Sequence, residues 1–102
     1  MKKLGIIGLG LIGSNIATHL VNTNHTLAVY DCDEQKRNRF SGKALVCNNA
    51  GEVLQNSDVV LLSLPTSEIV ESVMEELFAS GIQNKVVIDL STSFPLSTKA
   101  LY

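Results

Sequence analysis

The sequence has few of the residues that build disulfide or metal sites. Its 102 residues include only two cysteines, Cys32 and Cys47, with no C-x-x-C pair, and two histidines, His19 and His25, that stand alone. This pattern is typical of a protein kept in a reducing compartment, and it gives no cluster with metal-ligand spacing. We therefore predict no metal site and interpret both cysteines as structural or incidental thiols of a cytoplasmic protein.

Long apolar runs and basic blocks are also missing. No apolar run reaches the roughly 18 residues that suggest a membrane span. The apolar stretch after residues 1–3 is interrupted by three glycines and is not closed by a signal-peptide cleavage site. The formal net charge is −2, and the densest positive cluster, at residues 36–39, follows two acids. We predict neither a membrane nor a nucleic acid as partner.

The composition is that of one globular domain, with 45% hydrophobic and 18% charged residues. Apolar runs predict strands at residues 3–7, 26–31, 44–47, 58–64 and 85–90. The segments between them predict helices at 11–22, 34–40, 49–55 and 67–81, and residues 95–102 begin another. This alternation predicts an α/β fold of Rossmann type, a three-layer, doubly wound parallel sheet with strand order 3-2-1-4-5.

Polar side chains mark the ends and outer faces of these helices. Asp33, Asn49 and Ser67 are the predicted N-caps of the second, third and fourth helices. The apolar face of the fourth helix is predicted to comprise Ile69, Val70, Val73, Met74, Leu77 and Phe78. The charged residues interpreted as solvated surface are 34–39, Glu71, Glu75 and Glu76.

The stretch after the first strand contains G-x-G-x-x-G, formed by Gly8, Gly10 and Gly13. In a dinucleotide-binding turn the first glycine permits the tight turn. The second lets the backbone approach a pyrophosphate, and the third lets the helix lie close to the strand. The N–H groups and positive dipole of the helix N-terminus would then face the pyrophosphate. The alternative is a strand-to-helix turn that binds nothing.

The surroundings of the glycines favour the dinucleotide interpretation. Apolar residues at spacings of four (Ile12, Ile16, Leu20) follow the turn, and the second predicted strand ends in Asp31, eighteen residues after Gly13. That spacing is close to the roughly 20 residues expected for the acid that binds an adenosine ribose. Asp31 could instead cap the next helix, although Asp33 is better placed for that role.

Several polar or glycine-rich segments follow the carboxyl ends of the predicted strands. They are residues 8–13, Asp31, 63–66 and 91–93. In open α/β sheets, ligands bind in the crevice outside these strand ends, at the point where the strand order reverses. The topology therefore predicts one site, between the first and fourth strands.

Three motifs along the chain make it recognisable. The first reads G-L-G-L-I-G-S-N-I-A from residue 8 to 17, the second L-S-L-P at 62–65, and the third D-L-S-T at 89–92, followed by Pro95. Together they resemble the β-hydroxyacid dehydrogenases, which include 3-hydroxyisobutyrate dehydrogenase, tartronate semialdehyde reductase and 6-phosphogluconate dehydrogenase. A prephenate-dehydrogenase-like cofactor domain is the alternative that could supply the first motif, but not the third.

The resemblance implies a cofactor site built from all three motifs. The backbone of residues 9–14 would hold the pyrophosphate, Asp31 would accept hydrogen bonds from the adenosine ribose, and Thr92 would contact the nicotinamide end. The implied cofactor-binding residues are Gly8, Leu9, Gly10, Leu11, Ile12, Gly13, Asp31, Leu64, Pro65 and Thr92, and the implied substrate-binding residues are Ser91 and Thr92. Ile69 occupies a position where several members have a polar cofactor contact, so that role is not transferred. Pro65 could merely end its strand, and Ser91 and Thr92 could merely cap the final helix.

The acid at the end of the second strand bears on the choice of cofactor. A carboxylate at Asp31 repels a 2′-phosphate and pairs with a free 2′-hydroxyl, so we predict NAD rather than NADP. Arg37 and Arg39 could in principle reach a phosphate, but they lie on the following helix.

The resemblance also implies parts that this sequence does not contain. The family's catalytic lysine and its helical substrate and dimerisation domain come after the cofactor domain, so residues 1–102 would be an excised or truncated dinucleotide-binding domain. We assign no catalytic residue here. The parent would be a homo-oligomeric oxidoreductase that transfers a hydride between NAD and a small β-hydroxyacid. This chain alone would be inactive and would meet that substrate only with the missing domain. The alternative is a non-catalytic nucleotide-binding module.

Overall fold

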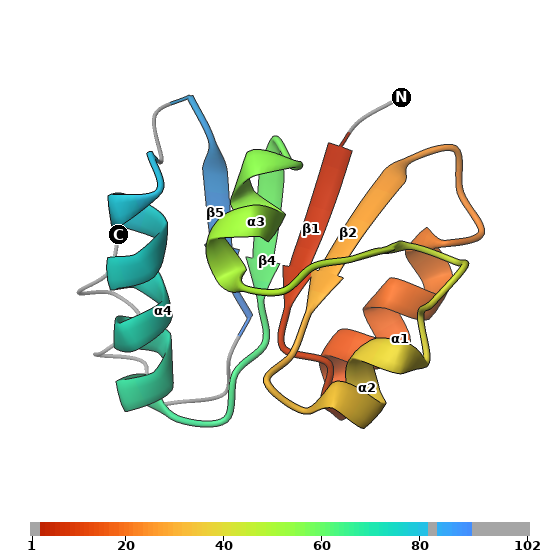
Figure 1. The fold of residues 1–102 in the computed structure, drawn as a ribbon, viewed down its shortest axis with the longest axis horizontal. Coiled ribbons are helices and arrows are strands. Elements are labelled where there is room, and N and C mark those ends of the chain that lie inside the picture. Colours follow the sequence, from red (N-terminus) through yellow and green to blue (C-terminus); the bar gives the residue numbers. More distant parts are fainter. Residues whose placement is uncertain (1–2, 82–83, 91–102) are drawn as a thin grey trace.

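The chain forms a five-stranded parallel sheet with helices packed against both faces (Figure 1). The computed structural model describes residues 3–81 and 84–90. The elements are β1 (Lys3–Ile7), α1 (Leu11–Leu20), β2 (Thr26–Tyr30), α2 (Glu34–Asn38), β3 (Leu45–Val46), α3 (Ala50–Gln55), β4 (Val59–Leu62), α4 (Ser67–Ala79) and β5 (Val86–Asp89). The sheet order is β3-β2-β1-β4-β5, which confirms the predicted α/β fold and strand order.

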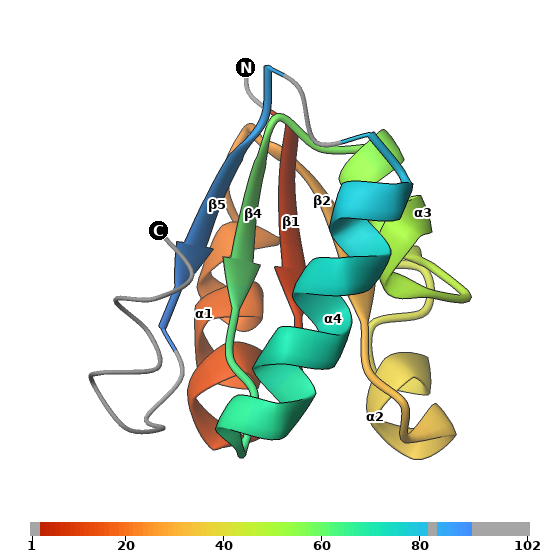
Figure 2. The ribbon, with the colours of Figure 1, turned by 90° about the vertical axis from the view of Figure 1, so that its left-hand side faces the viewer.

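The helices form two layers around the sheet (Figure 2). One apolar cluster joins β1 and β2 to α1 through residues such as Ile6, Val29 and Ala17. The other joins the opposite face of the sheet to α3 and α4 through residues such as Ile7 and Leu77. Successive residues of a strand point to opposite faces, so the central strand β1 must be apolar at consecutive positions. Ile6 and Ile7 are accordingly both 1% exposed.

The strand register aligns the carboxyl ends of the central strands. Ile7 of β1 pairs with Tyr30 of β2 on one side and with Leu62 of β4 on the other. The turns that follow these strands therefore lie together, at the lower edge of the sheet in Figure 1. This edge is where the sequence predicts the site.

Two predicted N-caps are confirmed and one is wrong. Asp33 Oδ1 accepts a hydrogen bond from Gln35 N (2.9 Å), and Asn49 Oδ1 accepts one from Glu52 N (2.8 Å). At α4 the cap is Thr66, whose Oγ1 accepts from Ile69 N at 3.2 Å, and not the predicted Ser67. Thr66 has the extended backbone of a cap (φ −139°, ψ 158°), so Ser67 is already the first helical residue.

Helix α4 has a narrower buried face than predicted. Val70, Met74 and Leu77 are buried, whereas Ile69 and Phe78 remain 41% and 60% exposed.

The described part of the chain contains no helix that is both long and apolar enough to cross a membrane. The predicted turn at residues 91–93 and the predicted helix at 95–102 lie outside the described residues.

Candidate functional site

A cavity of about 650 Å³ opens at the carboxyl edge of the sheet, within the size range of small-molecule sites. Its wall comes from the β1–α1 turn, the ends of β2 and β4, the starts of α2 and α3, one side of α4, and Leu90 after β5. The cavity therefore lies across the point where the strand order reverses, as the topology predicts.

The β1–α1 turn has almost no room for side chains at two of its glycines. Gly8 has φ +101°, and a Cβ on it would overlap the Ser63 carbonyl at the end of β4. A Cβ on Gly13 would overlap the Gly8 carbonyl. Gly8 therefore lets the turn lie against the end of β4, and Gly13 lets the start of α1 lie against the turn. Gly10 differs, because a Cβ there would meet nothing within 4 Å.

The N-terminus of α1 opens into this cavity without a side-chain cap. Gly10 is the N-cap, its carbonyl accepts from Ser14 N at 2.8 Å, and the first turn contains no acidic residue. The first N–H groups of a helix have no partner within the helix, and they carry the positive end of the helix dipole. Gly10, Leu11 and Ile12 line the cavity beside these donors, so this part of its wall suits an anion.

Asp31 fixes two turns at this edge. Its Oδ2 accepts a hydrogen bond from Leu9 N at 2.7 Å, and its Oδ1 accepts from Asp33 N at 2.8 Å. The carboxylate therefore ties the glycine turn to the end of β2. A carboxylate has about four acceptor positions, so Asp31 retains capacity for a ligand in the cavity that it lines. Since Asp33 caps α2, the alternative role of Asp31 as that cap is wrong.

The basic residues of α2 are not simply solvated, contrary to prediction. Arg37 Nη1 donates to the Asp31 carbonyl at 2.8 Å, and its guanidinium carbon lies 5.7 Å from the centre of the Tyr30 ring. Arg37 therefore supports the end of β2. Lys36 is half-buried and lines the cavity, whereas neither Arg37 nor Arg39 does.

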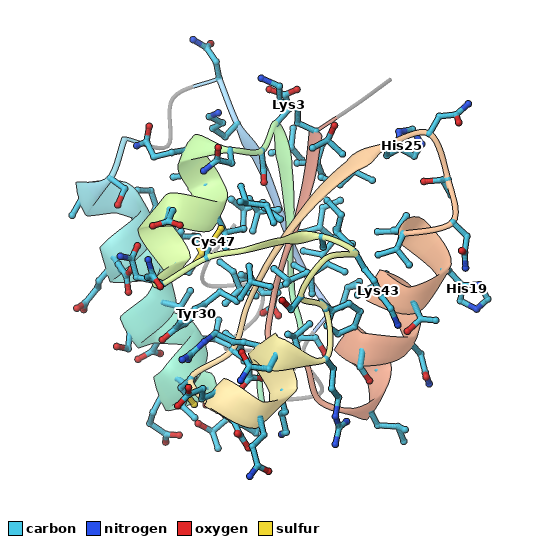
Figure 3. All side chains as sticks on the ribbon, turned by 45° about the vertical axis from the view of Figure 1, so that its right-hand side comes forward. Lys3, His19, His25, Tyr30, Lys43 and Cys47 are labelled. Atoms are coloured by element: carbon cyan, nitrogen blue, oxygen red, sulfur yellow. The ribbon has the colours of Figure 1, made fainter. Side chains whose placement is uncertain are left out.

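One side of the cavity is apolar. Leu64 and Pro65 line it together with Ile69 and Val73 of α4 and with Tyr30 of β2. Tyr30 and Val73 pack against the core cluster shared by α3 and α4, and Figure 3 shows Tyr30 on the β2 strand. A flat apolar ligand group would find contacts from both β2 and α4 here.

The predicted site residues fall into three groups. Those that line the cavity are Gly8, Gly10, Leu11, Ile12, Asp31, Leu64 and Pro65. Leu9 and Gly13 are buried behind it, and the Leu9 N–H holds Asp31. Ser91 and Thr92 lie outside the described residues.

Several cavity residues were not predicted from the sequence, and Glu76 is the most informative. Glu76 is exposed, as predicted, but it also lines the cavity, and its Oε2 accepts from Gly51 N in α3 at 2.9 Å. Its spacing gives the signal, because residues 69, 73 and 76 follow one another by four and three and so share a helix face. Lys36 and Tyr30 had no comparable signal.

The two cysteines lie in different environments. Cys32 is exposed and lines the cavity next to Asp31. Cys47 is fully buried, and burial, together with nearby Glu52, raises the pKa of its thiol to about 11. Only Cys32 is therefore accessible to a ligand or reagent in the cavity.

Known proteins are similar to this chain in sequence and in fold. The mitochondrial 3-hydroxyisobutyrate dehydrogenase of Drosophila melanogaster is 34% identical over 98% of this chain and 32% of its own length. The 2-hydroxy-3-oxopropionate reductase of Escherichia coli (strain K12) is 29% identical over 95% of this chain and 34% of its own. A Mycobacterium tuberculosis 3-hydroxyisobutyrate dehydrogenase structure with L-serine has a TM-score of 0.91 and 24% identity, over 99% of this chain and 35% of that one.

These relatives are about three times as long as this chain, which spans 32% and 34% of the first two. They therefore inform its cofactor domain directly and the activity of a whole enzyme only indirectly. A family model described as the NAD binding domain of 6-phosphogluconate dehydrogenase matches residues 3–102. With the glycine turn, the acid at the end of β2 and this match over nearly its whole length, the chain belongs to that family of NAD-binding domains.

Proposed function

We propose that the cavity binds NAD, and that the chain serves as the cofactor domain of an oxidoreductase acting on a small β-hydroxyacid. The observation that carries this proposal is the position of Asp31, whose carboxylate lies beside the uncapped N-terminus of α1 in one cavity. An anion site and an acid that can accept from a ribose are the two features a dinucleotide needs at this edge.

The glycine turn supplies the pyrophosphate site. The space around Gly10 is open, so a phosphate can approach the backbone there without meeting a side chain. The first-turn N–H groups of α1 would donate to the phosphate oxygens, and the dipole of the helix favours their charge. These donors are fixed by the helix, so little ordering is needed when the ligand binds.

Asp31 supplies the ribose site. Its hydrogen bonds to Leu9 N and Asp33 N fix the carboxylate before any ligand arrives. The acceptor positions that remain can receive the 2′- and 3′-hydroxyls of an adenosine ribose. The same negative charge opposes a 2′-phosphate, which supports NAD over NADP. Lys36, in the wall of the same cavity, is the cation that would favour NADP instead.

The apolar wall would receive the base, and the opposite end of the cavity would receive the nicotinamide. Leu64, Ile69 and Val73 offer apolar contacts on the side of α4, while Leu90 follows β5, which lies on the other side of β1 from Asp31. The bound cofactor supplies the hydride chemistry, and this chain's residues bind and orient it. Ser91 and Thr92, which follow Leu90 in the sequence, are proposed to contact the nicotinamide end and the substrate.

The substrate class rests on the relatives. A 3-hydroxyisobutyrate dehydrogenase and a 2-hydroxy-3-oxopropionate reductase are among the similar proteins. A family whose model is named for 6-phosphogluconate dehydrogenase contains this chain. We propose that the complete enzyme acts on a 3-hydroxyisobutyrate-like or 6-phosphogluconate-like hydroxyacid. Homo-oligomeric assembly and a cytoplasmic location are proposed with it.

Calorimetric titration of the chain with NADH and with NADPH tests the cofactor proposal. We expect the affinity for NADH to be at least about tenfold higher than the affinity for NADPH, because the Asp31 carboxylate would lie beside the 2′ position of the ribose. Asp31→Asn should weaken NADH binding and reduce this preference. Asp33→Asn is the matched control, since it removes a neighbouring charge while an asparagine can still cap α2. Tighter binding of NADPH, which would bring Lys36 into contact with the phosphate, or no binding at all, would contradict the proposal.

A further inference from the structure

Glu76 is a charged residue of the cavity that the ribose and pyrophosphate contacts do not use. It lies on α4 one turn beyond Val73, and its Oε2 accepts a hydrogen bond from Gly51 N at 2.9 Å. This hydrogen bond positions the carboxylate where α4 meets the start of α3, beside Ala50, and all three residues Ala50, Val73 and Glu76 line the cavity.

The order of the proposed subsites leads from the glycine turn towards this carboxylate. The pyrophosphate would lie at α1 and the ribose at Asp31, so the base must lie beyond Asp31. The cavity residues contributed by the end of β2, the start of α3 and the middle of α4 include Tyr30, Ala50, Val73 and Glu76. Three of them offer apolar or aromatic surface for a flat ring, and Glu76 offers acceptor oxygens.

We propose that Glu76 is a specificity-determining residue that selects adenine by accepting a hydrogen bond from its exocyclic 6-amino group. This inference rests on the proposed dinucleotide function. An ionised carboxylate is acceptor-only, so it can receive the amino group of adenine and repels the 6-oxo oxygen of hypoxanthine. Gly51 N occupies one acceptor position of the carboxylate, and the other oxygen remains able to accept.

A purely structural role for Glu76 makes a different prediction. The hydrogen bond to Gly51 N joins α3 to α4, and any acceptor at this position would maintain it. In Glu76→Gln the amide oxygen can still accept from Gly51 N, which directs the NH₂ group, a donor, towards the cavity. If Glu76 only joins the helices, this substitution leaves base selectivity unchanged. If Glu76 accepts a hydrogen bond from the base, the substitution changes the base selectivity.

The test compares NADH with reduced nicotinamide hypoxanthine dinucleotide, which differs in having a 6-oxo in place of the 6-amino group. Calorimetric titration of the wild-type chain should give roughly tenfold tighter binding of NADH. Glu76→Gln should abolish or reverse this ratio, because its NH₂ group donates to the oxo oxygen. Glu75→Gln is the matched control, since Glu75 and Glu76 are adjacent and both exposed on α4, but only Glu76 lines the cavity. This control should retain the wild-type ratio.

The outcomes separate this inference from the function on which it rests. Binding of NADH with an equal affinity for the hypoxanthine analogue, or an unchanged ratio in Glu76→Gln, would overturn the role of Glu76 and leave the dinucleotide site standing. Failure of the wild-type chain to bind either compound would overturn the proposed function, and the inference with it. Thermal unfolding of each variant shows whether the contact between α3 and α4 survives.

Discussion

The N-terminus of α1 differs from those of α2, α3 and α4. Each of the last three has a side-chain cap and an acidic residue in its first turn. The caps are Asp33, Asn49 and Thr66, and the acids are Glu34, Glu52 and Glu68. Helix α1 has Gly10 as its cap, no side-chain hydrogen bond there and no acid in its first turn.

At α2, α3 and α4 a side chain of the protein accepts a hydrogen bond from a first-turn N–H group, whereas the N-terminus of α1 leaves these N–H groups open to a ligand. A capping side chain stabilises a helix by roughly 1 kcal/mol, and a first-turn acid adds a favourable interaction with the dipole. At α1 both contributions are absent, and the end of the helix faces the cavity. We interpret this as stability given up locally so that the N–H groups and the dipole remain available to an anion.

The largest effect on stability should come from adding a side chain in the turn that leads into α1. Gly8→Ala places a side chain at φ +101° and against the Ser63 carbonyl, so we expect the free energy of unfolding to fall by about 3 kcal/mol or more. Gly42→Ala is the control. It also has a positive φ (+80°), but open space around it, so it should cost only about 1–2 kcal/mol. Urea denaturation measures both, and equal losses would contradict the steric part of this argument.

Capping α1 should abolish the difference between the helices. Gly10 has φ −70° and open space for a Cβ, so Gly10→Asp should fold normally and gain a few tenths of a kcal/mol as an N-cap. We expect NADH binding to weaken by roughly 30-fold, because the carboxylate takes the donors and repels the pyrophosphate. Titration calorimetry measures this loss.

Gly10→Ala is the control for that variant, because it adds bulk without charge or a hydrogen-bond acceptor. It should weaken binding less than Gly10→Asp does. An aspartate variant that binds NADH as well as the wild type would show that the open end of α1 has no role in binding.

The sequence predicted the fold because each element carries local signals. The apolar runs of the strands, and Asp33 and Asn49 before their helices, need no tertiary information. The cap of α4 was misassigned because Thr66 and Ser67 can both cap, and only the extended backbone of Thr66 decides between them. Local chemistry cannot make that choice.

The sequence predicted the cavity residues that lie in turns after strand ends. It did not predict the cavity residues that lie on α2, α3 and α4. Gly10, Asp31 and Leu64 belong to segments that follow strand ends, so topology alone brings them together. Lys36 reaches the cavity because α2 packs beside the end of β2, and Glu76 because α4 meets α3. Spacing within α4 places Glu76 on the same helix face as Ile69 and Val73, but which element that face meets depends on how the helices pack.

Removing a cap elsewhere should affect stability and leave binding unchanged. We expect Asn49→Ala to lower the free energy of unfolding by about 1 kcal/mol, because Glu52 N loses its acceptor. Asn49→Asp should retain the cap and the stability. Both variants should bind NADH with the wild-type affinity, and a clear loss of affinity in Asn49→Ala alone would mean that the start of α3 contributes to the site.

The smallest effects should distinguish the two cysteines. Iodoacetamide at pH 8 should modify Cys32 and not Cys47, and NADH should slow the reaction, because Cys32 lines the cavity and Cys47 is buried. Mass spectrometry of the digested chain measures both rates. Fast modification of Cys47 in the folded chain would contradict its burial.

The raised pKa of Cys47 also predicts a pH dependence of stability. The folded state disfavours the Cys47 thiolate. The contribution of the protonated thiol to the free energy of unfolding is therefore complete below about pH 9, and it is lost as the pH rises from about 9 to about 11. Urea denaturation across this range should show a steeper decline for the wild type than for Cys47→Ala.

The most direct test of the open helix end is a ¹⁵N-amide NMR titration of the chain with NADH. We expect the largest shift changes at the N–H groups of Gly10, Leu11, Ile12 and Gly13, and we expect these changes to disappear in Gly10→Asp. If NADH binds while these amides keep their shifts, or if no amide shifts at all, the N-terminus of α1 is not the pyrophosphate site.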